Sequence, residues 1–127
     1  MARFLLICLG GALGTAARYG LSTLCRSALG AGFPYGTLAV NIIGSFLLGM
    51  IMYVGLNTEL ISPTTRLVLG TGVMGGFTTY SSFNYETIQF VQDRAFLLAA
   101  VYLLATLCGC FVAGLLGIST TKWVWGK

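Results

Sequence analysis

Ten consecutive residues, Gly75–Asn84, carry hydroxyl, amide and aromatic groups within a chain that is otherwise mostly apolar. Seven of the ten are glycine, serine, threonine or asparagine, and the other three are Phe77, Tyr80 and Phe83. Hydroxyl and amide groups can bind an ion through hydrogen bonds. Backbone that leaves the helical form within a membrane is tolerated only where it is buried in protein or lines a wet cavity. The stretch therefore predicts a binding or permeation site.

Bond-breaking chemistry is not predicted for this chain. The sequence has no histidine, which is the commonest general base and metal ligand. It also lacks paired acids and a nucleophile–base set. Its four cysteines match no zinc-binding spacing and are predicted to be small buried hydrophobic side chains: Cys8, Cys25, Cys108 and Cys110. An enzyme is therefore not expected.

The helix that carries the polar stretch is predicted to break. Four glycines lie before or within it, Gly70, Gly72, Gly75 and Gly76, and each costs a helix interior about 1 kcal/mol relative to alanine. A break near residues 75–79 frees backbone carbonyls. Inside a membrane such carbonyls must bind a hydroxyl, a water or a cation.

Beyond the break, Tyr80, Phe83 and Glu86 follow one another at three-residue spacing and share a helical face. The edge of an aromatic ring carries positive charge, so rings turned edge-on can face an anion. The alternative is that these rings only pack against neighbouring helices. The sequence shows no set of acids suited to a cation channel, and its net charge is +4. An anion path is therefore favoured.

The second apolar segment places Asn41, Ser45 and Gly49 on one face at four-residue spacing. An asparagine within a membrane span needs a hydrogen-bonding partner, and small residues allow helices to approach closely. One interpretation is a helix-packing seam held by a single polar pair. The other is an asparagine that faces a pore or orients another side chain.

The first and last segments carry similar stripes. In the first, Gly10 and Gly14 predict a close helix contact, and Arg18 follows on the same face. An arginine at membrane depth is costly, so Arg18 either extends to the interface or attracts an anion at a pore mouth. The last segment has a stripe of hydroxyls and small residues, which comprises Tyr102, Thr106, Cys110 and Gly114.

The elements that position these residues are predicted to be membrane-spanning helices. The 127 residues are 57% hydrophobic and 8% charged, whereas a soluble domain has about a quarter of its residues charged. A span needs about 20 residues. The predicted fold is an all-α membrane protein with one four-helix transmembrane domain over residues 1–127. Its helices are expected at about Phe4–Leu24, Tyr35–Leu56, Leu67–Val91 and Phe96–Ile118, the first being retained rather than removed as a signal peptide.

Basic residues set the orientation of short membrane proteins. With four spans, the termini and the second loop share one side, which holds Arg3, Arg66, Lys122 and Lys127; the other side holds Arg26 and Arg94, with Arg18 near it. So weak a bias is compatible with one orientation or with insertion both ways round. Insertion both ways permits an antiparallel homodimer. A thin bundle has little interior for its polar groups, which also favours oligomerisation.

Three motifs together resemble the fluoride channels of the CrcB/Fluc family. In chain order they are Gly10-Gly11-x-x-Gly14-x-x-x-Arg18, Asn41-x-x-Gly44-Ser45-Phe46-x-x-Gly49, and Gly72-x-x-Gly75-Gly76-Phe77-Thr78-Thr79-x-Ser81-Ser82-Phe83 followed by Glu86. The third motif is the specific one. The chain departs from the family at Tyr80, where the pattern has phenylalanine, and at Cys110, where a hydroxyl is expected.

The resemblance implies an antiparallel, dual-topology homodimer in the bacterial inner (plasma) membrane, with two pores that export fluoride passively and no nucleic-acid partner. It implies a structural sodium ion at the dimer centre, held by the backbone carbonyls of Gly75 and Thr78. The implied fluoride pathway comprises Asn41, Tyr80, Phe83, Ser81, Thr79, Thr37, Glu86, Tyr102 and Thr106, with Arg18 toward a pore mouth.

Two rival functions are compatible with a small apolar chain. A small multidrug exporter, coupled to protons, is of similar size and dual topology, but that class has an acid in its first helix and this chain has none there. A non-transporting membrane scaffold would use the small-residue stripes for assembly alone.

Overall fold

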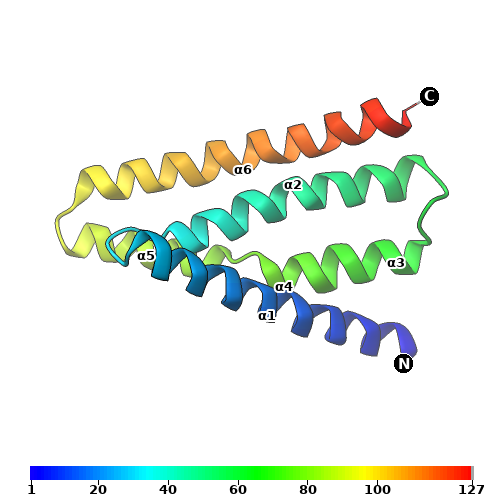
Figure 1. Cartoon of the computed structure of the whole chain (residues 1–127), viewed down its shortest axis with the longest axis horizontal. Helices are drawn as coiled ribbons and strands as arrows, with labels where there is room; N and C mark the ends of the chain where they lie inside the picture. Colours follow the sequence, from blue (N-terminus) through cyan, green and yellow to red (C-terminus); the bar gives the residue numbers. More distant parts are fainter. Residues whose placement is uncertain (127) are drawn as a thin grey trace.

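The computed structural model describes residues 1–126, and all the regular structure in that range is helical. The three long helices are α1 (Ala2–Leu29), α2 (Tyr35–Asn57) and α6 (Phe96–Trp125). The segment between α2 and α6 is divided into α3 (Pro63–Leu67), the π-helix η1 (Val68–Met74), α4 (Gly75–Phe77) and α5 (Tyr80–Gln92). Figure 1 shows these elements side by side, with the N-terminus, the C-terminal end and the α2–α3 connection at one end.

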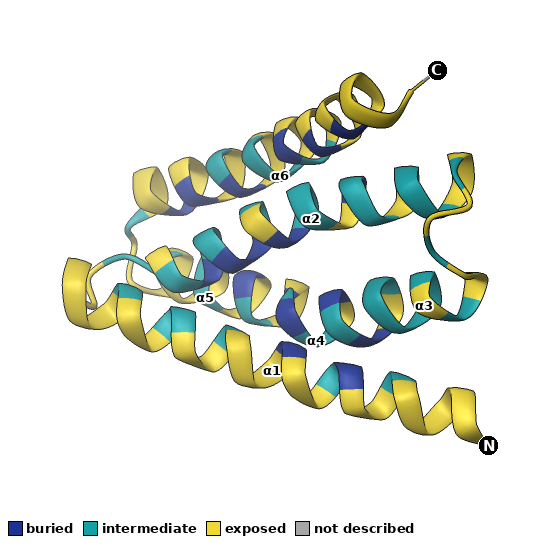
Figure 2. Cartoon of the chain, turned by 45° about the vertical axis from the view of Figure 1, so that its right-hand side comes forward, coloured by how far each residue is buried: buried dark blue, intermediate teal, exposed yellow. Residues whose placement is uncertain are grey.

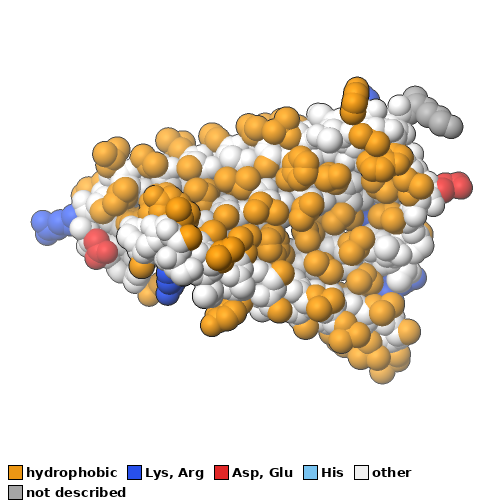
Figure 3. Space-filling model, in the orientation of Figure 1, with side chains coloured by type: hydrophobic (Ala, Val, Ile, Leu, Met, Phe, Trp, Pro, Cys, Tyr) orange, Lys and Arg blue, Asp and Glu red, His pale blue; other side chains and the backbone are white. Residues whose placement is uncertain are grey.

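Three of the helices, α1, α2 and α6, are long and apolar enough to cross a membrane. Figure 3 shows apolar side chains spread over the visible face, while the charged groups lie mostly toward the two ends. Many large apolar side chains point outward, as a lipid-facing surface requires. Two of these helices are longer than the sequence predicted. The first ends at Leu29 instead of Leu24, and the last ends at Trp125 instead of Ile118.

The divided segment has its break at Thr78 and Thr79. Thr78 has φ −83° and ψ 160°, and Thr79 has φ −153° and ψ 108°, so both have extended backbone between α4 and α5. The Thr79 hydroxyl accepts a hydrogen bond from the Ser82 N–H and so caps α5. The predicted break near residues 75–79 is therefore present at the end of that range.

Glycines set how closely the helices approach. A Cβ atom on Gly14 of α1 would overlap the backbone of Val73 and Phe77, and one on Gly117 of α6 would overlap the backbone of Phe46 in α2. Figure 2 shows buried residues along the facing sides of the helices. The small-residue stripes of the sequence are thus helix contacts, α1 with η1 and α4, and α2 with α6.

The cysteines differ from their prediction as buried residues. Cys8 and Cys108 are exposed on the outer surface, and Cys25 and Cys110 are half-buried. Apolar surroundings in the sequence do not separate an interior face from a lipid face, because both are apolar in a membrane protein. Of the basic residues considered above, Lys127 lies outside the described residues.

Candidate ion pathway at the helix break

The side chain of Asn41 in α2 binds the backbone of Thr79 at the break. Its Nδ2 donates to the Thr79 carbonyl at 3.0 Å, and its Oδ1 accepts from the Thr79 N–H at 2.8 Å. Asn41 and Thr79 are each only 8% exposed. The partner that a buried amide needs is therefore a backbone group of the broken segment, and Asn41 replaces the helical acceptor that the Thr79 N–H lacks.

The carbonyls of Gly75 and Thr78 are among those that lose their usual helical donors at the break. In an unbroken α-helix the Gly75 carbonyl would accept from Thr79 N–H, but that N–H binds Asn41. The Thr78 carbonyl would accept from Ser82 N–H, but that N–H binds the Thr79 hydroxyl. Within residues 1–126, no cluster of three histidine, cysteine or acidic side chains is arranged to hold a metal. A cation at the break would therefore have to bind carbonyl oxygens, which suit a hard ion.

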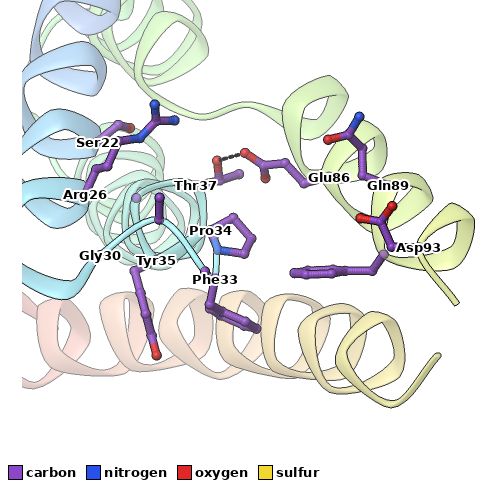
Figure 4. A pocket seen from close by; sticks show the side chains of 14 residues that line it. Ser22, Arg26, Gly30, Phe33, Pro34, Tyr35, Thr37, Glu86, Gln89 and Asp93 are labelled. Carbon is purple, nitrogen blue, oxygen red and sulfur yellow. Dashed lines mark hydrogen bonds between the residues drawn. The ribbon is translucent and has the colours of Figure 1, made fainter. Parts of the chain in front are cut away.

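The Glu86 carboxylate of α5 accepts hydrogen bonds from two hydroxyl groups. Thr37 of α2 donates to one carboxyl oxygen at 2.7 Å, and Tyr102 of α6 donates to the other at 2.6 Å. Figure 4 shows the Thr37 side chain directed at Glu86 across the cavity. Tyr102 is fully buried and Thr37 is 8% exposed. Three helices are thus joined at a single carboxylate.

Aromatic rings form an edge-to-face chain beside this cluster. Phe83 is 4% exposed, and its ring lies 5.2 Å from that of Tyr102 at an interplanar angle of 63°. Tyr80 lies 5.8 Å from Phe83 at 61°, and its ring is 73% exposed. The two rings predicted to line an anion path therefore do adjoin one another. Phe83 is held by packing, whereas Tyr80 has a largely free surface in the single chain.

Two cavities lie on either side of this arrangement. The first, about 360 Å³, is named here the Glu86 cavity; its lining includes Ser22, Arg26, Thr37, Glu86, Gln89 and Asp93 (Figure 4). The second, about 250 Å³, is named the Asn41 cavity. It is lined by Asn41, Gly44, Ser45, Leu48, Thr78, Tyr80, Phe83, Thr106, Leu107 and Cys110.

Three helices, α2, α5 and α6, each have residues at or beside both cavities. On α2, Thr37 is at the Glu86 cavity and Asn41, four residues later, is at the Asn41 cavity. On α5, Glu86 lines the Glu86 cavity and Phe83 lines the Asn41 cavity. On α6, Tyr102 binds Glu86, and Thr106 lines the Asn41 cavity. Polar and aromatic side chains of α2, α5 and α6 therefore line the two cavities, and the Tyr102–Glu86 hydrogen bond lies beside the first of them.

Three predicted pathway residues differ in their placement. Arg18 is half-buried on α1 and lines neither cavity. Ser81 is exposed on α5 and also lines neither one. Thr79 contributes its backbone to Asn41, while its hydroxyl donates to Ser82 at 2.9 Å. The structure brings the other predicted residues together at the two cavities or between them.

The sequence interpretation missed part of the Glu86 cavity. Arg26 and Asp93 lie at the ends of α1 and α5, and Figure 4 shows both side chains at this cavity. Ser22 lines it from the same side as Arg26, one helical turn earlier. The available signal was the four-residue spacing of Arg18, Ser22 and Arg26, which continues the stripe of α1 toward its end.

Comparison with known proteins places the chain in a family. Residues 5–118 match the model of the family described as CrcB-like protein, Camphor Resistance (CrcB). The chain belongs to the CrcB family. The match covers α1, α2, the broken segment and most of α6, and hence every residue of the two cavities named above.

Several relatives named fluoride-specific ion channel FluC are similar over nearly their whole length. The chain is 58% identical to that of Sorangium cellulosum (strain So ce56), over 96% of each chain. It is 54% identical to that of Anaeromyxobacter sp. (strain K), over 99% of this chain and all of the relative. A third, from Chlorobium chlorochromatii (strain CaD3), is 47% identical over 98% of this chain and 96% of the relative. With its apolar helices, this CrcB chain is a multi-pass integral membrane protein.

Proposed function

We propose that the chain is a fluoride-selective channel that exports the ion passively across the bacterial inner membrane. The observation that carries this proposal is the line of hydroxyl, amide and ring-edge groups between the two cavities, in a chain whose relatives are named fluoride-specific channels. A member of a channel family is not an enzyme. Passive passage of fluoride depends on where the side chains of the pathway lie and needs no covalent chemistry.

The donors along the line suit a small, strongly hydrated anion. Losing water must be offset by several donors in succession, and no single site can hold the ion too tightly if it is to leave. Thr106 offers an O–H group, Asn41 offers the second N–H of its amide, and Phe83 offers a ring edge, while the Tyr102 O–H is donated to Glu86. In the proposed pathway, Thr37 and Glu86 continue the line, Tyr80, Thr79 and Ser81 lie at its side, and Arg18 lies toward a mouth.

An antiparallel homodimer is the assembly we propose. The broken segment is proposed to be the fourth span, and it leaves polar groups exposed on both sides of its break: Thr71 and Gly75 before it, Ser81 and Asn84 after it. Lipid cannot bind these groups, whereas a second copy can. Insertion in both orientations relates the two copies by an axis in the membrane plane. Each of two pores would then be lined by both copies.

A structural sodium ion at the dimer centre completes the proposal. Gly75 is exposed at the break, and the carbonyls of Gly75 and Thr78 lack their helical donors, as described above. Two such pairs, one from each copy, would offer four oxygens to one cation. The test is an experimental structure of the dimer in sodium. An ion at these four oxygens supports the site, and a two-fold axis that passes elsewhere would exclude it.

The channel itself is tested by fluoride efflux from proteoliposomes, with chloride efflux as the control anion. The chain and its Tyr80→Phe variant are measured in parallel, because the variant removes the hydroxyl and gives the phenylalanine of the family pattern. We expect fluoride efflux and no chloride efflux from both. Absence of fluoride efflux from both proteins would refute the function. Proton-coupled uptake of an organic cation would instead support the exporter class.

A further inference from the structure

The Asn41 cavity contains a hydroxyl that no protein group satisfies. Thr106 is 5% exposed, and its Oγ1 has no hydrogen-bond partner among the described residues. Leaving a buried polar group without a partner is unfavourable. Thr106 lines the Asn41 cavity, so the unsatisfied hydroxyl belongs to a residue of the cavity wall.

Cys110 lines the same cavity. It lies four residues after Thr106 on α6, so the two side chains share a helical face. Ser45 and Leu48 of α2 line the cavity with it. Cys110 is a free, half-buried thiol.

The other thiols are placed differently. Cys108 is on the same helix but exposed on its outer surface, and Cys8 is likewise exposed. Cys25 is half-buried on α1. None of the three lines either cavity. One thiol of the four therefore combines contact with the cavity and a position beside an unsatisfied hydroxyl.

We propose that Cys110 is a covalent modification site for small thiol-reactive electrophiles and that its modification blocks ion passage. This proposal rests on the proposed function, because it places the Asn41 cavity on the ion pathway. With a thiosulfonate, the Cys110 thiolate attacks the divalent sulfur, an S–S bond forms, and sulfinate leaves with the electron pair of the broken bond. The thiol proton passes to water. The added alkylthio group occupies the space between α6 and α2.

The probe is methyl methanethiosulfonate, which adds a neutral methylthio group. Three proteins are compared: the unaltered chain, the variant with Cys8, Cys25 and Cys108 all changed to alanine, and Cys110→Ser. Fluoride efflux from proteoliposomes is measured before treatment, after treatment, and after dithiothreitol. Intact mass counts the groups added. We expect efflux of the first two proteins to fall to the leak of protein-free liposomes and to return with dithiothreitol, while Cys110→Ser keeps its efflux.

Two results would overturn the proposal. One is full labelling of Cys110 in the triple variant with efflux unchanged. The other is a Cys110 thiol that stays unlabelled in the folded triple variant. If Cys110→Ser does not fold, Cys110→Ala takes its place. Absence of efflux before treatment is a separate outcome, which refutes the proposed channel; labelling of Cys110 then still decides whether the thiol is open to the reagent. We also expect fluoride, but not chloride, to slow the labelling.

Discussion

Replacing Asn41 with alanine tests the part that this side chain has in joining α2 to the broken segment. The change removes two hydrogen bonds, of 3.0 and 2.8 Å, and leaves the buried N–H of Thr79 without a partner. Hydrogen bonds between membrane helices contribute about 0.6–1.7 kcal/mol each, so the pair predicts a loss of about 1–3 kcal/mol. The expected loss of stability comes from the lost hydrogen bonds at the helix break and not from lower helix propensity, because alanine is a good helix former.

The assay is reversible unfolding in mixed micelles with increasing dodecyl sulfate, followed by the fluorescence of the two tryptophans of α6. Ser45→Ala is the matched control, since it is on the same helix and its hydroxyl bonds only the Asn41 carbonyl of its own helix, at 2.7 Å. We expect Asn41→Asp to lose less than Asn41→Ala, because it keeps an acceptor for Thr79 N–H. Equal stability of Asn41→Ala and Ser45→Ala would refute the reasoning.

Two further variants have matched controls in the chain. Gly14→Ala is expected to lower the free energy of unfolding by about 1–3 kcal/mol, because the added methyl group overpacks the contact with Val73 and Phe77. Gly20→Ala has open space at its Cβ position and is expected to raise the free energy of unfolding by up to about 1 kcal/mol. The dodecyl sulfate titration compares the two variants. Tyr102→Phe removes a hydrogen bond to Glu86, which is worth about 1.5–3 kcal/mol when the acceptor is charged, and should reduce fluoride efflux. Tyr85→Phe, on the exposed side of α5, should not change efflux, and an equal loss in both variants would contradict the assigned pathway.

The sequence predicted which residues are helical far better than where helices end. Hydropathy marked α1 only to Leu24, but the helix continues to Leu29 through the polar residues Arg26 and Ser27. Hydropathy reports where a chain meets lipid, and a helix can extend beyond that depth. The π-helical form of η1, which packs against α1, was also not foreseen.

The sequence predicted most residues of the candidate site but not which of them bind one another. Spacing placed Asn41 on a polar face, yet two interpretations remained, and only the structure showed its partner to be the Thr79 backbone. The joining of Thr37 and Tyr102 at Glu86 depends on how three helices are arranged. Periodicity along one helix gives the face of a residue. It does not give the residue on another helix that the face will meet.

The contact between Gly117 and the backbone of Phe46 has a consequence for the order of synthesis. The partner of α2 is the last helix made, about 40 residues after α2 ends, which at about 5–20 residues per second is a delay of roughly 2–8 s. Thr79 emerges before α6, so Asn41 can find its peptide partner first. The Asn41–Thr79 pairing is therefore available before α6 is made, and the cavity wall formed by Thr106, Leu107 and Cys110 is the last part to be added.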